Sequence, residues 1–333
     1  MQGEMSVKKA VKTVLGFAVG DALGLPYRGK TREELKEEPA RDMTEDEADH
    51  LPAGAWSDLT GILLAEQAAM KNDIDFGRIL TELKAREEEG KYTSTGNVVF
   101  RSEYIVSALN AFQEGTDPLL CGRSDDDSWN NESLCRMLPA VLHIFFDRDV
   151  DYIDTKECYS FVEKVSAITH RTPICYIACS IYTHLLLYLL EHKTQSVREL
   201  SAVAADKVIE YYNGIEETAE FTGYYKVMAD EKFAETDENE IRSGSSVVNT
   251  LLAAVWCLVS STSFEECLLK AVNLGGDTNA VAALAGSMAA LVFPEDEAFI
   301  KWQNTLIKKE EITLQTENFY PDASTGNSVS SVI

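Results

Sequence analysis

The chain has 333 residues, of which 45% are hydrophobic, and its formal net charge at pH 7 is −25. A chain of this length can bury a substantial core. So large a negative charge excludes sequence-independent binding to nucleic acid or to an anionic membrane surface, because both need clustered Lys and Arg side chains, and the sequence has no such cluster.

The cysteines and the N-terminal segment indicate a cytoplasmic protein. Seven cysteines are scattered without any CxxC spacing, and Cys175 and Cys179 lie four residues apart in an apolar helical pattern, where we expect both to be buried. The first residues lack the pattern of a signal peptide, and no stretch reaches the roughly 20 apolar residues of a membrane span. We therefore expect a location in the reducing cytoplasm.

Helical periodicity covers most of the chain, and no segment alternates apolar and polar residues over five or more positions. This pattern predicts an all-α fold of a dozen or so helices in a single domain over residues 1–322, followed by a disordered Ser/Gly/Asn-rich tail at 323–333. The predicted helices cover residues 7–23, 31–38, 57–67, 76–88, 103–112, 134–146, 152–168, 173–190, 197–212, 246–260, 264–272, 280–291 and 295–309.

Two local patterns make sharper predictions near the N-terminus. Gly16, Gly20 and Gly24 recur at intervals of four on one face of the first helix, which lets a neighbouring helix approach closely. Thr31 and Glu34 have the spacing of a capping box at the start of the second helix.

The longer irregular segments lie further along the chain. Residues 115–131 form the longest predicted loop, a length that is often functional, and its acidic run Asp125 to Asp127 is typical of a solvated loop. The acidic segment 214–242 is predicted to be a surface excursion with a helical piece.

Two aspartates stand at predicted helix starts. Asp277 follows Gly275 and Gly276, which end the preceding helix, and Asp58 follows Ser57 at the start of another helix. An aspartate at such a position is most simply a cap that binds the free N–H groups of the first turn. The alternative is that the two carboxylates serve a common site.

Six short motifs together resemble the ADP-ribosylglycohydrolase family, in order and in spacing, over almost the whole chain. Each motif is weak alone, and their ordered combination is specific. The motifs are Gly20-Asp-Ala-Leu-Gly-Leu-Pro26, Leu51-Pro-Ala-Gly-Ala-Trp-Ser-Asp58, Arg136 after a loop that contains Asn131, Thr169-His170, the segment from Ser243-Gly to Trp256, and Gly275-Gly-Asp-Thr278.

The resemblance implies a compact all-α fold with a cleft at helix ends. In the family, a Thr/Ser-Asp-Asp triplet and an Asp-Thr-Asp-Thr segment hold two magnesium ions, and the enzymes remove ADP-ribose from protein side chains or related acceptors. Mg²⁺ prefers such hard oxygen ligands. The resemblance therefore implies Mg²⁺ as cofactor, and ADP-ribose or an ADP-ribosylated acceptor as partner.

The motifs place Ser57, Asp58 and Asp277 at metal-binding positions, and Asp58 and Asp277 are the candidate catalytic residues. Other positions depart from the family pattern. Leu59 replaces the second carboxylate of the triplet, and the second segment reads Asn279-Ala280 in place of an aspartate and a threonine. These departures leave the presence of Mg²⁺ open.

A further departure introduces a cation. Arg28 stands where family members have a glutamate. Two dications beside an arginine and few carboxylates would be poorly neutralised. We therefore expect Arg28 to occupy or border the vacated metal site and to fork to Asp58, Asp277 or both.

The resemblance also supplies the candidate ligand-binding residues, which are Ser128, Trp129, Asn131, His170 and Arg28. The loop that surrounds ADP-ribose in the family reads Asn130-Asn131-Glu132-Ser133 here, so Glu132 adds bulk and negative charge. Arg136 is expected to brace this loop from behind.

Three functions remain open. The chain is a relative that binds ADP-ribose without ordinary hydrolysis, a divergent hydrolase that works with one metal ion or none, or an acidic protein-interaction module without a small-molecule ligand. Loss of several metal ligands favours the first, since each such ligand matters by orders of magnitude.

Overall fold

The computed structural model describes residues 2–319 except 72–73, 126–127, 149, 192–194 and 231. Over these residues the fold is helical throughout and contains no strand, as the periodicity predicts. The tail predicted at 323–333 and the last two residues of the Asp125 to Asp127 run lie outside the described residues.

The α-helices of the described chain are α1 (Gln2–Gly24), α2 (Arg32–Glu37), α3 (Asp58–Ala69), α4 (Phe76–Glu89), α5 (Glu103–Gln113), α6 (Glu132–Cys135), α7 (Leu138–Asp147), α8 (Lys156–Ala167), α9 (Pro173–Glu191), α10 (Val197–Asn213), α11 (Glu216–Ala219), α12 (Val247–Val259), α13 (Phe264–Asn273), α14 (Thr278–Val292), α15 (Glu297–Thr305) and α16 (Lys309–Phe319). Short 3₁₀ turns join them: η1 (Leu25–Tyr27), η2 (Pro118–Leu120), η3 (Val150–Tyr152), η4 (Glu220–Ala229), η5 (Phe233–Glu235) and η6 (Glu238–Glu240).

Three helix predictions are wrong. The segment 134–146 is split into α6 and α7 by a turn at Arg136 and Met137. Helix α8 begins at Lys156 rather than 152, because the hydroxyl of Thr155 caps it by accepting from Cys158 N. The helix predicted over 295–309 ends at Thr305 as α15, and the helix that follows it, α16, was not predicted. Only three residues of α16 are buried, and its apolar periodicity is weak.

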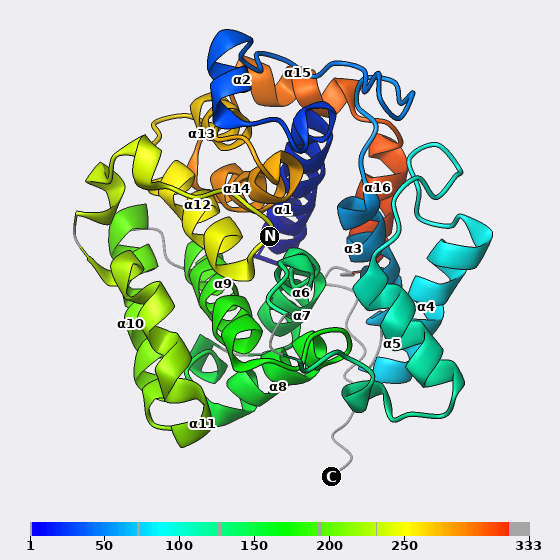
Figure 1. Cartoon of the computed structure of the whole chain (residues 1–333), viewed down its shortest axis with the longest axis vertical. Helices are drawn as coiled ribbons and strands as arrows, with labels where there is room; N and C mark the ends of the chain where they lie inside the picture. Colours follow the sequence, from blue (N-terminus) through cyan, green and yellow to red (C-terminus); the bar gives the residue numbers. More distant parts are fainter. Residues whose placement is uncertain are drawn as a thin grey trace.

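The first helix and α14 form the centre of the fold, where Figure 1 shows them side by side. The glycines predicted to allow close contact do so. A Cβ atom on Gly20 would lie 2.0 Å from Ala282 O, and one on Gly24 would lie 2.6 Å from Asn279 Cα. This close packing brings the C-terminal end of α1 against the first turn of α14.

Helix α9 is the other central element. By length and composition it could cross a membrane, but 83% of its most apolar window is buried inside the protein, where it packs against α8 and α10. It is therefore the core helix of this fold, and its apolar character is explained by burial.

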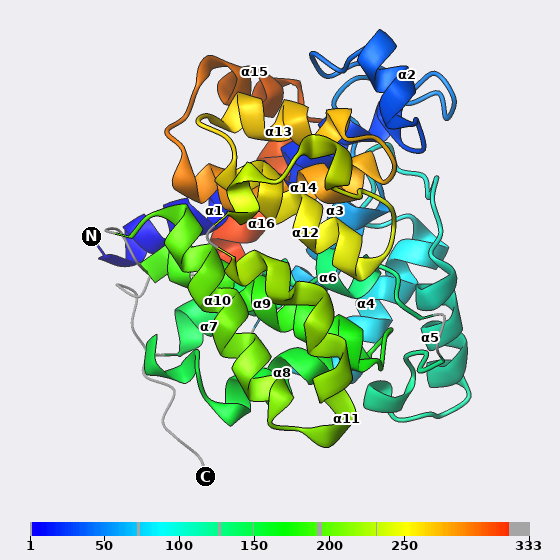
Figure 2. The same ribbon diagram turned by 60° about the vertical axis from the view of Figure 1, so that its left-hand side comes forward.

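The remaining helices surround this centre. Helices α10 and α11 form one flank, and α4 and α5 form the opposite one (Figure 1). Helices α2, α13 and α15 gather at one end of the molecule (Figure 2).

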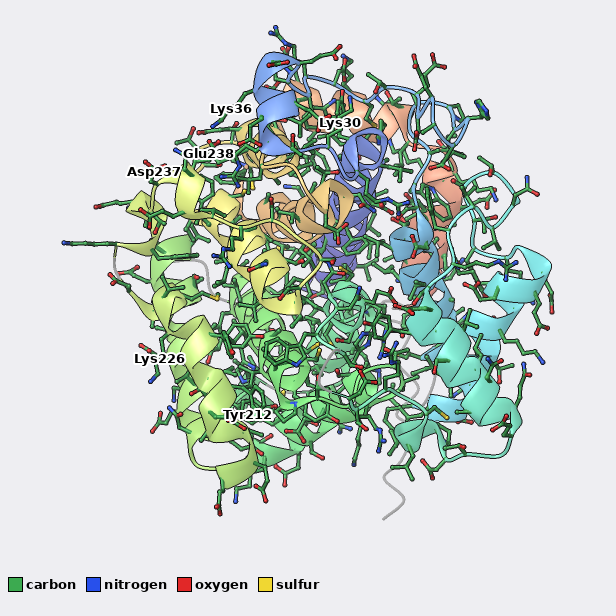
Figure 3. All side chains as sticks on the ribbon, in the orientation of Figure 1. Lys30, Lys36, Tyr212, Lys226, Asp237 and Glu238 are labelled. Atoms are coloured by element: carbon green, nitrogen blue, oxygen red, sulfur yellow. The ribbon has the colours of Figure 1, made fainter. Side chains whose placement is uncertain are left out.

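Hydrogen bonds from α2 hold the segment that precedes α12. Figure 3 shows Lys36 beside Glu238, and Lys36 Nζ donates to Asn239 Oδ1 at 3.2 Å. The Arg32 guanidinium donates to the carbonyl oxygens of Glu238 and Ile241. These hydrogen bonds fix the segment that leads to Ser243, and Ser243 contacts the start of α14.

Candidate functional site

A fully buried carboxylate, Asp21, joins α1, α3 and α14. Its two oxygens accept five hydrogen bonds: from Ser57 N at 3.0 Å, Ser57 Oγ at 2.7 Å, Thr60 N at 3.1 Å, Thr60 Oγ1 at 2.7 Å and Asn279 Nδ2 at 3.1 Å. Burial raises the pKa of Asp21, and the hydrogen bonds from these three residues oppose the rise. Asp21 thereby fixes the start of α3 against the first turn of α14.

Ser57 has its hydroxyl group fully engaged. It is the N-cap of α3, and its Oγ donates to Asp21 while accepting from Leu59 N at 3.1 Å and from Asn279 Nδ2 at 3.2 Å. The next residue, Asp58, is half-buried, whereas the side chain of Leu59 is buried in the core. Of this triplet, the carboxylate of Asp58 remains available.

Asp277 lies at the N-cap position of α14, but its side chain does not cap the helix. Its backbone N–H donates to Ser243 O at 2.8 Å, and its Oδ2 accepts from Asn131 Nδ2 at 2.7 Å. Asn131 also donates to Thr250 Oγ1 at 2.8 Å. The interpretation of Asp277 as a simple cap is therefore wrong, because its carboxylate is turned toward the predicted ligand loop.

The electrostatics connect Asp277 to Asp58 and to Arg28. Burial raises the pKa of Asp277, the hydrogen bond from Asn131 and the charge of Arg28 lower it, and the charge of Asp58 raises it. The charge of Asp58 thus acts on Asp277, and the placement of both carboxylates at one binding site stays a prediction.

A third carboxyl group, Glu132 at the start of α6, belongs to this site. It accepts a hydrogen bond from Ser102 Oγ. Burial raises the pKa of Glu132 to about 7, and the negative charges of Asp58 and Asp277 contribute to the rise. Near neutral pH this carboxyl group can both donate and accept a proton.

Arg28 borders the site but does not fork to its carboxylates. Its guanidinium carbon lies 3.9 Å from the centre of the Phe100 ring. Within the described chain no ion pair of 4.0 Å or less joins Arg28 to Asp58 or Asp277, although its charge lowers the pKa of Asp277. The expected fork is therefore wrong, because the exposed guanidinium is attracted to the face of an aromatic ring instead.

The loop that carries Arg28 is tied to the start of α14. Gly29 N donates to Gly276 O, and Gly276 N donates to Lys30 O, each at 2.8 Å. Gly276 has φ +74°, and a Cβ atom there would lie 2.6 Å from Ser243 O. Only glycine fits this close approach of three backbone segments.

Two of the other predicted ligand residues lie in the loop that contains Asn131. Ser128 is fully buried, and its Oγ donates to Asp125 Oδ1 at 2.9 Å. Trp129 is half-buried and packs edge-on against Phe221 and Tyr224, at ring-centre distances of 6.2 and 5.7 Å. Trp129 is thus placed to offer an aromatic surface, whereas the Ser128 side chain holds the loop together.

His170 lies inside the protein. It is fully buried, its Nδ1 is 2.9 Å from Thr169 Oγ1, and its ring stacks on Tyr104 with 4.4 Å between centres. Burial, with the positive charge of Arg136, lowers the pKa of His170 to about 3, so the ring is neutral. This geometry favours a supporting role for His170 over contact with a ligand.

Arg136 braces the loop from behind, as expected. Its guanidinium forms a buried ion pair with Glu66 at 2.7 Å and donates to Val165 O, Ser166 O and Thr169 Oγ1 at 2.6 to 3.1 Å. It thereby joins the turn after α6 to α3 and to the end of α8.

The side-chain oxygens at the predicted metal-binding positions can be compared with the ligands that Mg²⁺ requires. Leu59 and Ala280 offer no side-chain oxygen, and Asn279 turns its NH₂ group toward Asp21 and Ser57, which leaves its buried Oδ1 without a hydrogen-bond partner. In the part of the chain that the structure describes, no three or more His, Cys, Asp or Glu side chains come together so as to hold a metal ion. Of Leu59, Asn279 and Ala280, which depart from the family pattern, Asn279 alone has a side-chain oxygen, whereas Mg²⁺ prefers several hard oxygen ligands.

The cavity beside Asp58 is small. It measures about 10 Å³ and is lined by Trp56, Ser57, Arg86 and Phe100 among others. Pockets that hold drug-sized ligands measure roughly 300 to 1,000 Å³, so this cavity is too small for such a ligand. Phe100 lines it from a segment that has no helix or strand between residues 90 and 102.

Sequence reasoning missed Asp21, Glu132 and Phe100 as residues that shape the site. Asp21 carried a usable signal, because it is an acidic residue among the apolar residues of the first helix. Glu132 was noted for its bulk but not for its proton affinity. Phe100 lies in an irregular segment, where nothing in the local sequence points to Arg28.

The comparisons with known proteins point to one family. The family model described as ADP-ribosylglycohydrolase matches residues 4–326. The chain is 24% identical over 318 residues to the ADP-ribosylarginine hydrolase Tri1 of Serratia proteamaculans (strain 568), with 95% of this chain and 80% of the relative covered. It is 25% identical to the ADP-ribosyl-[dinitrogen reductase] glycohydrolase of Rhodospirillum rubrum, with 93% and 94% covered.

A solved structure supports the fold. The chain is similar to a protein titled "ADP-ribosylglycohydrolase-related protein complex", with a TM-score of 0.72 and 22% sequence identity. The match covers 95% of this chain and 98% of the solved one.

Proposed function

The chain belongs to the ADP-ribosylglycohydrolase family, and on this premise we propose that it binds ADP-ribose, or an ADP-ribosylated protein side chain, with little or no ordinary hydrolase activity. The dinuclear magnesium site is incomplete in this proposal. The binding cleft lies between Asp58, Asp277 and the loop of Trp129 and Asn131.

One observation carries the proposal. Asn279 Nδ2 donates to Asp21 at 3.1 Å and to Ser57 Oγ at 3.2 Å. The family resemblance puts a bridging carboxylate at this position. An N–H group that points at these oxygens repels a cation, and the single neutral Oδ1 of Asn279 cannot replace two charged oxygens.

Ligand entry requires a local opening. The Phe100 ring lines the small cavity beside Asp58 and lies against the Arg28 guanidinium. In the bound state we expect the segment around Phe100 to swing outward and the Arg28 guanidinium to pair with the diphosphate of ADP-ribose. Arginine suits this role, because its planar donors match phosphate oxygens.

The Tri1 relatives from Serratia and Pseudomonas putida (strain GB-1) bear the name ADP-ribosylarginine hydrolase. ADP-ribosylarginine is therefore the first acceptor to test. The chain has seven free, buried cysteines, which supports a cytoplasmic location for this binding protein.

Calorimetric titration with ADP-ribose, with and without Mg²⁺, tests the proposal. We expect binding that does not depend on Mg²⁺, and tighter binding by about tenfold in the Phe100→Ala variant, because the ring no longer has to be displaced. The variant Phe293→Ala, which removes a half-buried aromatic ring outside the site, is the control. Mg²⁺-dependent binding and turnover would contradict the proposal, and no binding would favour a protein-interaction role.

A gain-of-function set tests the metal assignment separately. The combination Arg28→Glu, Leu59→Asp, Asn279→Asp and Ala280→Thr should gain Mg²⁺ affinity, measured by calorimetry. The same set without Asn279→Asp is the control, and it should gain much less. Equal affinity in both variants would show that Asn279 is not the decisive departure.

A second candidate function is favoured by Glu132. A carboxyl group with a pKa of about 7 beside Asp58 and Asp277 suits general acid–base catalysis. In this alternative the protein hydrolyses an ADP-ribosyl bond with one metal ion or none. Turnover of ADP-ribosylarginine in excess EDTA that is lost in Glu132→Gln would support it.

A further inference from the structure

A groove far larger than the cavity at Asp58 lies on another part of the molecule. Its volume is about 530 Å³, which is within the usual range for small-molecule sites. The residues that line it come from the start of α4, the end of α7, η3 and α8, and they are Ile74, Phe76, His143, Ile144, Arg148, Tyr152, Lys156, Glu157, Ser160, Phe161 and Lys164. We call this the α7–α8 groove; none of these residues belongs to the candidate site.

The charge of this groove is opposite to that of the whole chain. Arg148, Lys156 and Lys164 line it together with a single acidic residue, Glu157, in a protein with a net charge of −25. Over the described residues, no ion pair within 4.0 Å joins any of the three cations to a carboxylate. A cluster of unpaired cations attracts an anion and concentrates it locally.

Two neighbouring carboxylates offset part of this charge. One is Asp147, and the other is Glu163, whose pKa is raised by burial and lowered by the charge of Lys164. His143 Nε2 lies 3.6 Å from Asp147 Oδ2, and burial lowers the pKa of His143. The first turn of α8, capped by Thr155, supplies Lys156 and Glu157 to the groove. The positive end of this 12-residue helix therefore adds to the attraction for an anion.

Aromatic side chains supply the apolar part of the groove. Phe76, Tyr152 and Phe161 are half-buried and line it. The Arg148 guanidinium lies 5.4 Å from the centre of the Tyr152 ring, and the His143 and Phe161 rings lie 5.8 Å apart. Flat apolar faces next to cations suit a ligand that combines an aromatic ring with negative charge.

We propose that the α7–α8 groove binds an aromatic phosphate compound of about mononucleotide size. The phosphates lie against Arg148, Lys156 and Lys164, and the aromatic ring lies against the three aromatic side chains. The groove accepts this ligand without any rearrangement of the cleft at Asp58, so the inference is independent of the proposed function.

Calorimetric titration of the full chain with ATP in EDTA tests the groove. We expect the Lys156→Gln/Lys164→Gln variant to bind ATP at least about tenfold more weakly, because two charge-assisted contacts are lost. The matched control is Lys91→Gln/Lys226→Gln, which changes the net charge equally; Lys226 lies on the flank formed by η4 (Figure 3). The control should bind ATP within about twofold of the unmodified protein.

Fragments of ATP test separately whether the groove needs the aromatic ring and the phosphates of its ligand. Adenosine and tripolyphosphate should each bind at least about tenfold more weakly than ATP, because each lacks one of the two features. Added NaCl should weaken ATP binding in the unmodified protein, a readout that needs no variant. Thermal melting of each lysine variant checks that it is folded.

Several outcomes would overturn the proposal. These are no binding of ATP, equal weakening in the two lysine variants, or tripolyphosphate binding as tightly as ATP. Loss of ATP binding in Asn131→Ala would also overturn it, because ATP would then occupy the cleft at Asp58. Whether ADP-ribose binds in the cleft at Asp58 is read from the Asn131→Ala variant, so a titration that Asn131→Ala leaves unchanged counts against the proposed function and not against the groove.

Discussion

Two buried charge clusters of this protein differ in how their charges are balanced. In the first, Arg136 pairs with Glu66 at 2.7 Å and its remaining donors are taken up by backbone and hydroxyl oxygens. In the second, the charge of the half-buried Asp58 raises the pKa of Asp21, Asp277 and Glu132, and no cation is hydrogen-bonded to any of the four in the described chain. In the first cluster the two charges are paired with each other. In the second, the hydrogen bonds to the carboxyl groups come from neutral donors.

This difference in charge balance distinguishes a cluster that stabilises the fold from one that can take up a proton or a ligand. The charge of Arg136 opposes the effect of burial on Glu66, so this pair holds helices together. Burial raises the pKa of Glu66 all the same, and it also raises the pKa of Asp21, Asp277 and Glu132, which have no hydrogen-bonded cation. Uncompensated carboxylates in a folded protein mark a place that can take up a proton or a ligand. Variants of each cluster therefore test whether the two really differ.

The largest effect is expected for Arg136→Met. Removing the guanidinium leaves Glu66 buried without its partner, which typically costs about 3 to 5 kcal/mol in the free energy of unfolding. Urea denaturation followed by circular dichroism measures it. The double variant Arg136→Met/Glu66→Leu should recover much of the loss, since no buried charge remains. A loss that persists unchanged in the double variant would show that packing, rather than charge, dominates this cluster.

A smaller loss is expected for Asp21→Asn. The new NH₂ group faces donors from Ser57 and Thr60, so buried hydrogen bonds are lost and the free energy of unfolding falls by about 2 to 3 kcal/mol. The exposed N-cap Asp75 provides the control, because Asp75→Asn keeps a good capping residue and should cost only a few tenths of a kcal/mol. Equal losses in the two variants would contradict the central role of Asp21.

Glu132→Gln should change how stability depends on pH. Because folding raises the pKa of Glu132 to about 7, its contribution is fully present below pH 4.5 or so and is lost as the pH rises through 7. The variant should therefore be more stable than the unmodified protein at pH 8, by roughly 3 kcal/mol, since the pKa rises from 4.5 to about 7 and one pKa unit corresponds to about 1.4 kcal/mol. The gain should vanish toward pH 5.

The control for this pH effect is Glu103→Gln, an exposed residue at the start of α5. It should give unfolding curves parallel to those of the unmodified protein from pH 5 to 8. If Glu132→Gln also gave parallel curves, Glu132 would be ionised throughout this range, and the case for general acid–base catalysis would fail.

The sequence predicted those parts of this arrangement that depend on local patterns. The glycines of the first helix predicted its close contact with a neighbour, and Thr31 and Glu34 do form a capping box. The contact between Arg28 and the Phe100 ring was not predictable from the sequence. Phe100 lies 72 positions away in an irregular segment, and such a contact depends on the packing of the whole fold.

The smallest effect is expected for Arg28→Gln. Arg28 is exposed and lowers the pKa of Asp277 only through space, so its loss should raise that pKa while the free energy of unfolding changes by less than about 1 kcal/mol. Carbon-detected NMR titration of the Asp277 carboxyl group measures the pKa. The control Arg101→Gln removes the same charge beside Glu87 and should leave Asp277 unchanged. Conversely, Phe100→Ala frees the guanidinium to approach the carboxylates, so the pKa of Asp277 should fall. If it does not fall, Arg28 is kept from Asp277 by its own loop rather than by the Phe100 ring.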